Sequence, residues 1–138
     1  MPAAKQHSHA RAWLADRFAD EDSFVGLAWS ALYSFARLVS NRRSFGDEAV
    51  DVPAASAAAD AFGRQNTARI VEPGNAHHTI AAELMRTPGL SANDVPDVHL
   101  AALAMEHGLI LCTVDHGFAR FGSLRWENPT LTSGEKAA

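Results

Sequence analysis

The stretch from Asp94 to Asp115 constrains the fold more than any other part of the chain, because it encodes one helix followed at once by one strand. Asp94 is of a type that caps helices, Pro96 suits a first helical turn, and Asp97 lies among the free amides of that turn. Apolar residues between 100 and 104 give the helix a broad apolar face, and Gly108 suits the left-handed position that ends it. The sequence therefore predicts a helix that begins at Asp94 and stops at Gly108.

A strand follows this helix without a linker. Residues Leu109 to Thr113 form an apolar run that is typical of a strand in a parallel sheet with helices on both faces. In such a sheet the first turn of a helix and the end of the strand that it feeds lie at the same edge, where these folds bind ligands. We therefore expect Asp97 and Asp115, which are far apart in sequence, to be near neighbours at that edge.

Two carboxylates that converge at one edge repel each other unless a proton or a divalent cation lies between them. Mg²⁺ is commonly held by one or two carboxylates together with the phosphate oxygens of a substrate. Asp97 and Asp115 therefore predict a Mg²⁺ or Mn²⁺ site for phosphodiester chemistry. Each aspartate alone is equally typical of a helix cap, a helix-dipole partner or a turn residue, so the structural interpretation stays open.

The bulk composition predicts one globular domain over residues 1–138, ordered from about 7 to 129, with a frayed tail over 130–138. The sequence holds no apolar run that would cross a membrane, and its start, from Lys5 to Arg11, is polar and histidine-rich, unlike a signal peptide. We expect a cytoplasmic protein. Cys112 is the only cysteine, so no intrachain disulfide is possible, and we expect it to be a small core residue.

The formal net charge of −4 argues against a broad electrostatic surface for nucleic acid. A local basic cluster of Arg37, Arg42 and Arg43 remains, and these side chains are candidates for contacts with the phosphates of a nucleic acid. The same cations also suit the negative end of a solvated helix, so both interpretations stay open. The seven histidines show no zinc-ligand spacing, which favours surface positions for most of them.

The other elements follow from apolar periodicity and from turn residues. The helix expected over 29–39 is apolar on most sides and is therefore predicted to be central to the core, and Met85 is predicted to point inward. We expect helices over 6–18, 29–39, 53–64 and 75–86, strands over 24–28, 68–71 and 123–127, and a helical turn that contains Phe118 and Phe121.

Several of these segments resemble one known family. The segments that match it closely are DVHLAALAMEHG over 97–108, TVD over 113–115, FARF over 118–121 and LRWENP over 124–129; weaker matches are RAWL over 11–14, GLAW over 26–29 and FARL over 35–38. By these segments the C-terminal half of the chain closely resembles that of PIN-domain ribonucleases of the VapC toxin type, and the weaker matches extend the resemblance over most of the sequence.

This resemblance implies an α/β fold, namely a three-layer α/β/α PIN-like domain with a mostly parallel sheet. It implies an endoribonuclease toxin of a type II toxin–antitoxin system that uses Mg²⁺ or Mn²⁺, is restrained by a VapB-type antitoxin and forms a homodimer. By the same carry-over Asp97 is a catalytic metal ligand and Asp115 is a second member of the acidic cluster. Thr113 and Asp94 would be supporting residues beside them.

The sequence also departs from the family pattern. The family opens with a strand that ends in an Asp-x-Asn type motif, whereas this sequence opens with the first helix, as expected of a misplaced start or a truncated gene. The glutamate of the family's next helix has no counterpart here, where Ser30 or Ser34 takes its place, and a further family aspartate is Gly117. These losses suggest an alternative, a catalytically inactive PIN-like domain that binds antitoxin or RNA. A receiver-like domain with Asp115 as phosphoacceptor is a third interpretation, but the sequence offers no second acidic pair for it.

Overall fold

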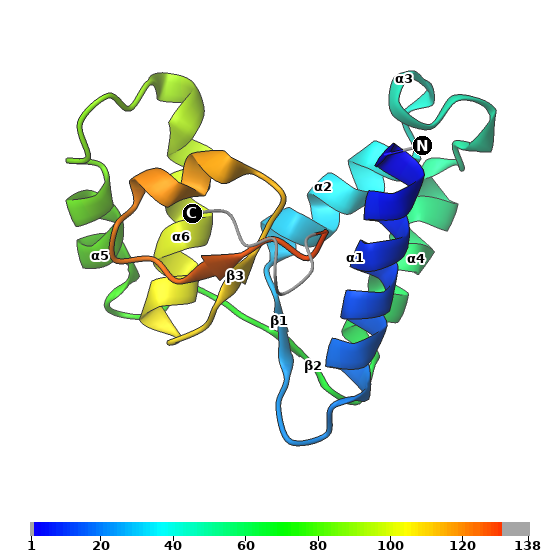
Figure 1. The fold of residues 1–138 in the computed structure, drawn as a ribbon, viewed down its shortest axis with the longest axis horizontal. Coiled ribbons are helices and arrows are strands. Elements are labelled where there is room, and N and C mark those ends of the chain that lie inside the picture. The colour runs from blue at the N-terminus through cyan, green and yellow to red at the C-terminus, as the bar shows by residue number, and fades with distance from the viewer. Residues whose placement is uncertain (1, 131–138) are drawn as a thin grey trace. The chain divides into compact units, whose positions relative to one another are not determined.

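The computed structural model describes residues 2–130, with side chains from residue 11 onward. The chain divides into two compact units. The N-terminal unit comprises residues 17–72, and the C-terminal unit comprises residues 73–130 together with residues 2–16. Helix α1 (Pro2–Ala19) contributes residues to both units; Figure 1 shows it as one continuous helix. None of the helices in the described residues is long and apolar enough to span a bilayer.

The N-terminal unit pairs two short parallel strands and packs two helices against each other. β1 (Val25–Leu27) and β2 (Ala68–Ile70) run parallel, with the middle residues of the two strands opposite each other. α2 (Trp29–Val39) packs on α4 (Val52–Gly63), and the edge of the Phe35 ring meets Phe62 at a centroid distance of 5.2 Å. A short helix, α3 (Arg42–Phe45), and a 3₁₀ turn over 46–48 join them.

Local signals explain where α4 begins. The side chain of Asp51 accepts a hydrogen bond from the amide of Ala54 at 2.9 Å, and Pro53 lies in the first turn, where its missing N–H is not needed. Ala55 and Ala59 are buried on the same side of α4, because their small side chains allow close packing. The alanine-rich segment is therefore a packing helix, as the sequence predicts.

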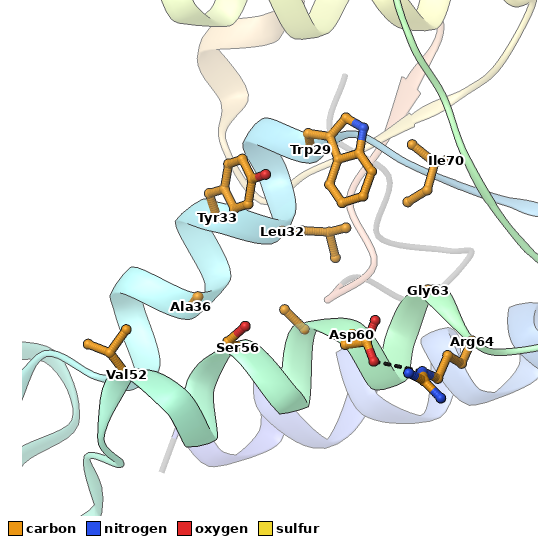
Figure 2. Close-up of a pocket in the computed structure, with 11 residues that line it drawn as sticks. Trp29, Leu32, Tyr33, Ala36, Val52, Ser56, Asp60, Gly63, Arg64 and Ile70 are labelled. Atoms are coloured by element: carbon orange, nitrogen blue, oxygen red, sulfur yellow. Dashed lines mark hydrogen bonds and ion pairs between the residues drawn. The ribbon is translucent and has the colours of Figure 1, made fainter.

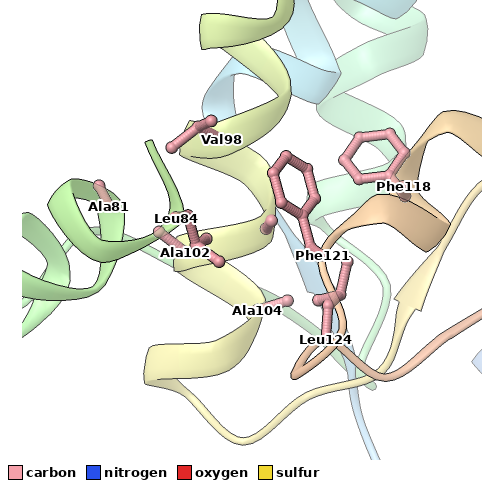
Figure 3. Packing of buried hydrophobic residues seen from close by; sticks show 9 residues of the cluster. Ala81, Leu84, Val98, Ala102, Ala104, Phe118, Phe121 and Leu124 are labelled. Atoms are coloured by element: carbon pink, nitrogen blue, oxygen red, sulfur yellow. The ribbon is translucent and has the colours of Figure 1, made fainter. Parts of the chain in front are cut away.

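The C-terminal unit is organised around α6 (Val95–Glu106), which is buried on several sides. α5 (His77–Leu84) packs on one side of α6, and Phe118 and Phe121, from the chain just beyond β3 (Leu111–Cys112), pack on another. Figure 3 shows the Phe121 ring beside α6, with Phe118 and Leu124 next to Phe121. β3 runs parallel to β4 (Trp126–Glu127), so the only two strand pairs of the described residues are both parallel.

Several expectations about burial and strand length are wrong. The strand expected over 109–113 is paired only at Leu111–Cys112, and Cys112 is exposed and not a core residue. Met85 lies just past the end of α5 and is half exposed. Only Leu32 and Val39 of α2 are buried, so this helix lines a groove instead of forming the centre of the core. The prediction of one domain over 1–138 stays a prediction.

Candidate active site

The first turn of α6 and the end of a 3₁₀ turn over 116–120 bring two acids and one arginine together. Nη2 of Arg120 lies 3.0 Å from Oδ2 of Asp97 and 3.3 Å from Oδ1 of Asp94. The three side chains are 25–30% exposed, so each charge is partly removed from water. One guanidinium nitrogen therefore lies between two carboxylates, and the site carries one more negative than positive charge.

Asp94 does not cap α6, which corrects the sequence prediction. Its Oδ2 accepts hydrogen bonds from the amide of Ser91 at 2.8 Å and from the Ser91 hydroxyl at 3.2 Å. Ser91 is therefore the N-cap of the 3₁₀ turn over 92–94 that precedes α6, and the backbone is already helical at Asp94. The hydrogen bond from the Ser91 amide lowers the pKa of Asp94 most; burial opposes it, and the charge of Arg120 and the Ser91 hydroxyl lower the pKa further.

Asp115 joins the same cluster through Gly117. Its Oδ1 accepts a hydrogen bond from the amide of Gly117 at 2.8 Å, and its own amide donates to the hydroxyl of Thr113 at 3.1 Å. The carbonyl of Gly117 in turn accepts a short hydrogen bond from Nη1 of Arg120. Asp97 and Asp115 are thus linked through Gly117 and Arg120, and the predicted residues at 94, 97, 113 and 115 all belong to one hydrogen-bonded cluster.

Arg120 is the member of this cluster that sequence reasoning missed. The matched FARF segment contains it, but nothing in the pattern gives the arginine a role. One signal was available: Arg120 is the only Lys or Arg between Gly108 and Arg125. A lone cation between a strand end and an aromatic residue is a candidate partner for the acids at that edge of a sheet.

The ligands present suit a hard divalent cation and not zinc. Among residues 11–130 no three His, Cys, Asp or Glu side chains form a group that could hold a metal ion. Zn²⁺ normally requires three or four protein ligands, whereas Mg²⁺ is commonly bound by one or two carboxylates, with waters and substrate phosphates completing the octahedron. The Asp94 and Asp97 oxygens that face one cationic nitrogen fit the second description.

The histidines form one notable pair. The rings of His77 on α5 and His99 on α6 lie 5.1 Å apart, and Nδ1 of His77 is buried with no hydrogen-bond partner among the described residues. Burial lowers the pKa of His99, and the neighbouring His77 lowers it further. The pair lacks the third ligand that a transition-metal site requires within the described chain.

The predicted basic cluster lies in the N-terminal unit. Arg37 is in the last turn of α2 and lines a pocket of about 230 Å³ with Ser34 and Asn41. Arg42 and Arg43 form the start of α3, where the Asn41 side chain accepts a hydrogen bond from the Arg43 amide at 2.9 Å. The structure therefore leaves these three arginines exposed on one end of the α2–α3 connection.

A groove of about 540 Å³ lies in the same unit and is lined by residues of both α2 and α4. Figure 2 shows Trp29, Leu32 and Tyr33 of α2 on one side and Ser56 and Asp60 of α4 opposite them. Tyr33 and Val52 are two-thirds exposed at its rim, and Trp29 is about half exposed although its indole N–H bonds the Glu72 carboxylate. This groove is largely apolar and was not predicted from the sequence.

Comparison with known proteins gives a consistent result. The family model described as the PIN domain matches residues 4–124. The chain is 37% identical over 125 residues to ribonuclease VapC43 of Mycobacterium tuberculosis and to a Mycobacterium bovis protein named VapC ribonuclease Mb2897, covering 91% of this chain and 84% of each relative. It is 33% identical over 126 residues to ribonuclease VapC37 of M. tuberculosis, covering 91% of this chain and 86% of that relative.

A solved structure gives the same fold. The VapBC-1 complex from nontypeable Haemophilus influenzae contains a chain that matches with a TM-score of 0.63 at 14% sequence identity, covering 87% of both chains. At this level of identity the likeness shows the fold. The α/β fold of PIN type expected from the sequence is therefore confirmed.

Proposed function

Because the chain belongs to the PIN-domain family of VapC ribonucleases, we propose that it is a toxin endoribonuclease with a divalent-metal centre in which Asp97 is the principal ligand, Asp94 lies beside it, and Asp115 belongs to the same acidic cluster. PIN-domain ribonucleases generally depend on a divalent metal, and the hard carboxylate oxygens of Asp94 and Asp97 favour Mg²⁺ or Mn²⁺. The observation that supports this most strongly is the placement of two carboxylates, those of Asp94 and Asp97, around one cationic nitrogen of Arg120.

The proposed roles follow from these contacts. A bound divalent ion would supply Lewis-acid stabilisation of the charge that develops on the phosphate during in-line attack. Asp97 would hold that ion from the rigid first turn of α6, with Asp94 beside it. Thr113 would support the site by fixing the backbone of Asp115 through its hydroxyl, which keeps the Asp115 carboxylate at the end of β3.

The test is cleavage of a labelled RNA in the presence of Mn²⁺. We expect Asp97→Asn to reduce cleavage by about 100-fold or more, the order of magnitude for removing one electrostatic stabiliser of a transition state. Glu83→Gln is the matched control, because Glu83 lies in the same unit and forms an exposed ion pair with Arg86. Metal-dependent cleavage that Asp97→Asn leaves unchanged would refute the assignment.

The second candidate is a PIN-like domain that binds RNA or antitoxin without cleaving. The observation that favours it is the number of acids: within the described residues only two carboxylates, those of Asp94 and Asp97, lie at the position of the Arg120 nitrogen, and no group of three potential metal ligands is present. EDTA-sensitive cleavage by the 138-residue chain would exclude it. Tight RNA binding without cleavage at saturating Mn²⁺ would support it.

For the substrate, we propose that Arg37, Arg42 and Arg43 contact RNA phosphates, since the three exposed cations lie at one end of the N-terminal unit. Replacing all three by glutamine should weaken RNA binding and reduce its dependence on salt, as expected for lost phosphate contacts. Fluorescence anisotropy with a labelled oligoribonucleotide at two salt concentrations measures both. An unchanged salt dependence would leave the three arginines as helix-end charges only.

For the partner, we propose a VapB-type antitoxin, since the similar Haemophilus structure is a VapBC complex. We assign its apolar helix to the groove between α2 and α4, because the exposed Tyr33 and Val52 sides of this groove are apolar. Tyr33→Asp should reduce co-purification with a co-expressed VapB-type antitoxin. Val95→Asp, at a half-exposed position of the C-terminal unit, is the control.

Two further expectations rest on the family alone. A homodimer stays a prediction, which light scattering of the purified chain will test. A cytoplasmic location is proposed because an RNA-cleaving toxin meets its substrate there, and cell fractionation tests it.

A further inference from the structure

Arg120 binds the acidic cluster in the manner of a small cation and not in the usual manner of an arginine. A guanidinium often binds a carboxylate in a bidentate manner, through two parallel N–H···O hydrogen bonds. Here a single nitrogen, Nη2, is shared by Asp94 and Asp97, while Nη1 bonds the backbone carbonyl of Gly117. In the described structure, neither carboxylate forms a bidentate interaction with the guanidinium.

The hydrogen bonding of this arginine is also incomplete. Nε of Arg120 is buried and has no hydrogen-bond partner within the described residues. A buried N–H group without an acceptor destabilises the protein, because it has given up its hydrogen bond to water and formed no other in return. The guanidinium carbon also lies over the Phe121 ring, 4.7 Å from its centroid, so the ring face supports the positive charge although one N–H has no acceptor among the described residues.

The backbone at Gly117 makes room for this arrangement. A Cβ built on Gly117 would lie 2.5 Å from Nη1 of Arg120 and 3.0 Å from Oδ1 of Asp115. Any side chain at this position would therefore displace the guanidinium. The absence of a side chain at Gly117 lets Arg120 reach the carboxylates of Asp94 and Asp97.

We propose that Arg120 is the counter-cation of the acidic site and that a divalent cation binds Asp94 and Asp97 by displacing it. This inference rests on the metal site of the proposed function. The guanidinium neutralises one of two negative charges at 3.0–3.3 Å, whereas Mg²⁺ would neutralise both at roughly 2.0–2.1 Å. Because the guanidinium stays protonated at any accessible pH, the competition is constant across the neutral range.

The test measures Mn²⁺ affinity by calorimetry on the RNA-free protein. Arg120→Gln removes the competing charge, and we expect it to bind Mn²⁺ about fivefold more tightly, the upper end of the range for one partly exposed ion pair. Gly117→Ala keeps the charge but pushes the guanidinium away, so it should also tighten binding. Arg125→Gln is the matched control for lost charge, because Arg125 donates to the carbonyl of Gly108 and not to either acid.

A third variant separates this inference from the proposed function. If Asp97→Asn binds Mn²⁺ as well as the wild type does, the metal site itself is wrong and both proposals fail. If Asp97→Asn loses binding while Arg120→Gln binds no more tightly than Arg125→Gln, only the role of Arg120 is overturned.

A measurement on the unaltered protein guards against variants that misfold. In side-chain NMR spectra, saturation with diamagnetic Mg²⁺ should shift the Nε–Hε signal of Arg120 and leave that of Arg125 in place. An unmoved Arg120 signal at saturating Mg²⁺ would overturn the proposal whatever the variants show.

Discussion

Replacing Gly117 by alanine should destabilise the protein by breaking the contacts of Arg120. The new methyl carbon would lie 2.5 Å from Nη1 of Arg120, closer than real Cβ contacts allow. Nη1 is the far end of a flexible side chain, so the backbone need not move. The guanidinium would instead swing away and give up its bonds to the Gly117 carbonyl and to Asp97.

The size of the effect follows from the exposure of these groups. A hydrogen bond to a charged partner is worth roughly 1.5–3 kcal/mol when buried, and an exposed ion pair about 0–1 kcal/mol. Arg120 and Asp97 are 25% and 28% exposed, between these limits. We therefore expect a loss of about 1–2 kcal/mol in the free energy of unfolding, equivalent to a fall in Tm of roughly 3–6 °C for a chain of this size.

Urea unfolding of two alanine variants tests this value. Gly122→Ala is the control, because nothing lies within 4 Å of a Cβ at Gly122 and its backbone is not left-handed. We expect it to stay within about 0.5 kcal/mol of the wild type. In an Arg120→Ala background the cost of Gly117→Ala should fall by about half or more, because the group that the methyl displaces is gone.

Two outcomes would refute this reasoning. The first is a Gly117→Ala protein as stable as Gly122→Ala. The second is a cost at Gly117 that stays the same without Arg120, which would assign the effect to the Gly117 amide and Asp115.

Two predictions concern other parts of the chain. Phe121→Ala should cost about 3–5 kcal/mol, since its ring is 2% exposed, whereas Phe45→Ala, at an exposed position, should cost under about 1 kcal/mol; chemical denaturation compares them. Glu106 accepts hydrogen bonds from the amides of Gly74 and Ala76, the first of which lowers its pKa most. Because the pKa of Glu106 is lower in the folded than in the unfolded protein, its ionised form stabilises the fold at pH values above the ordinary carboxyl pKa. This contribution is lost as the pH falls through the pKa of the folded state. Melting curves at pH 6 and pH 4 should therefore show a larger loss of Tm for the wild type than for Glu106→Gln; equal losses would contradict this.

The sequence predicts the elements whose ends are set by local chemistry. α2 has the predicted bounds of 29–39, and α4 starts within one residue of the expected Pro53, with Asp51 as its cap. Gly108 is left-handed, with φ of 67°, just after α6 as predicted. In each case the deciding interaction lies within a few residues of the boundary, so the sequence contains the information.

Burial is less predictable because it depends on what packs against an element. The side chain of Glu106, although charged, is only 10% exposed and binds the loop before α5, some thirty residues away. Cys112 lies in an apolar run that suggests burial, yet its side chain is exposed. Apolar periodicity shows which face of a helix or strand is apolar. It does not show whether another element of the fold packs against that face.

The candidate site divides in the same way. The topology of a helix that feeds a parallel strand predicts that Asp97 and Asp115 lie at one edge, and the structure links the two residues through Gly117 and Arg120. Arg120 was not foreseen because its partner, Asp97, is 23 residues away in sequence, and only the 3₁₀ turn over 116–120 brings the guanidinium back to α6. The metal-ligand roles of the two aspartates stay predictions.

Anomalous diffraction from a crystal of the protein soaked in Mn²⁺ tests the metal site most directly. We predict a manganese peak between the carboxylates of Asp94 and Asp97, with the Arg120 guanidinium turned away from both. A crystal at saturating Mn²⁺ with no peak there, and with Nη2 of Arg120 still between the two acids, would contradict it.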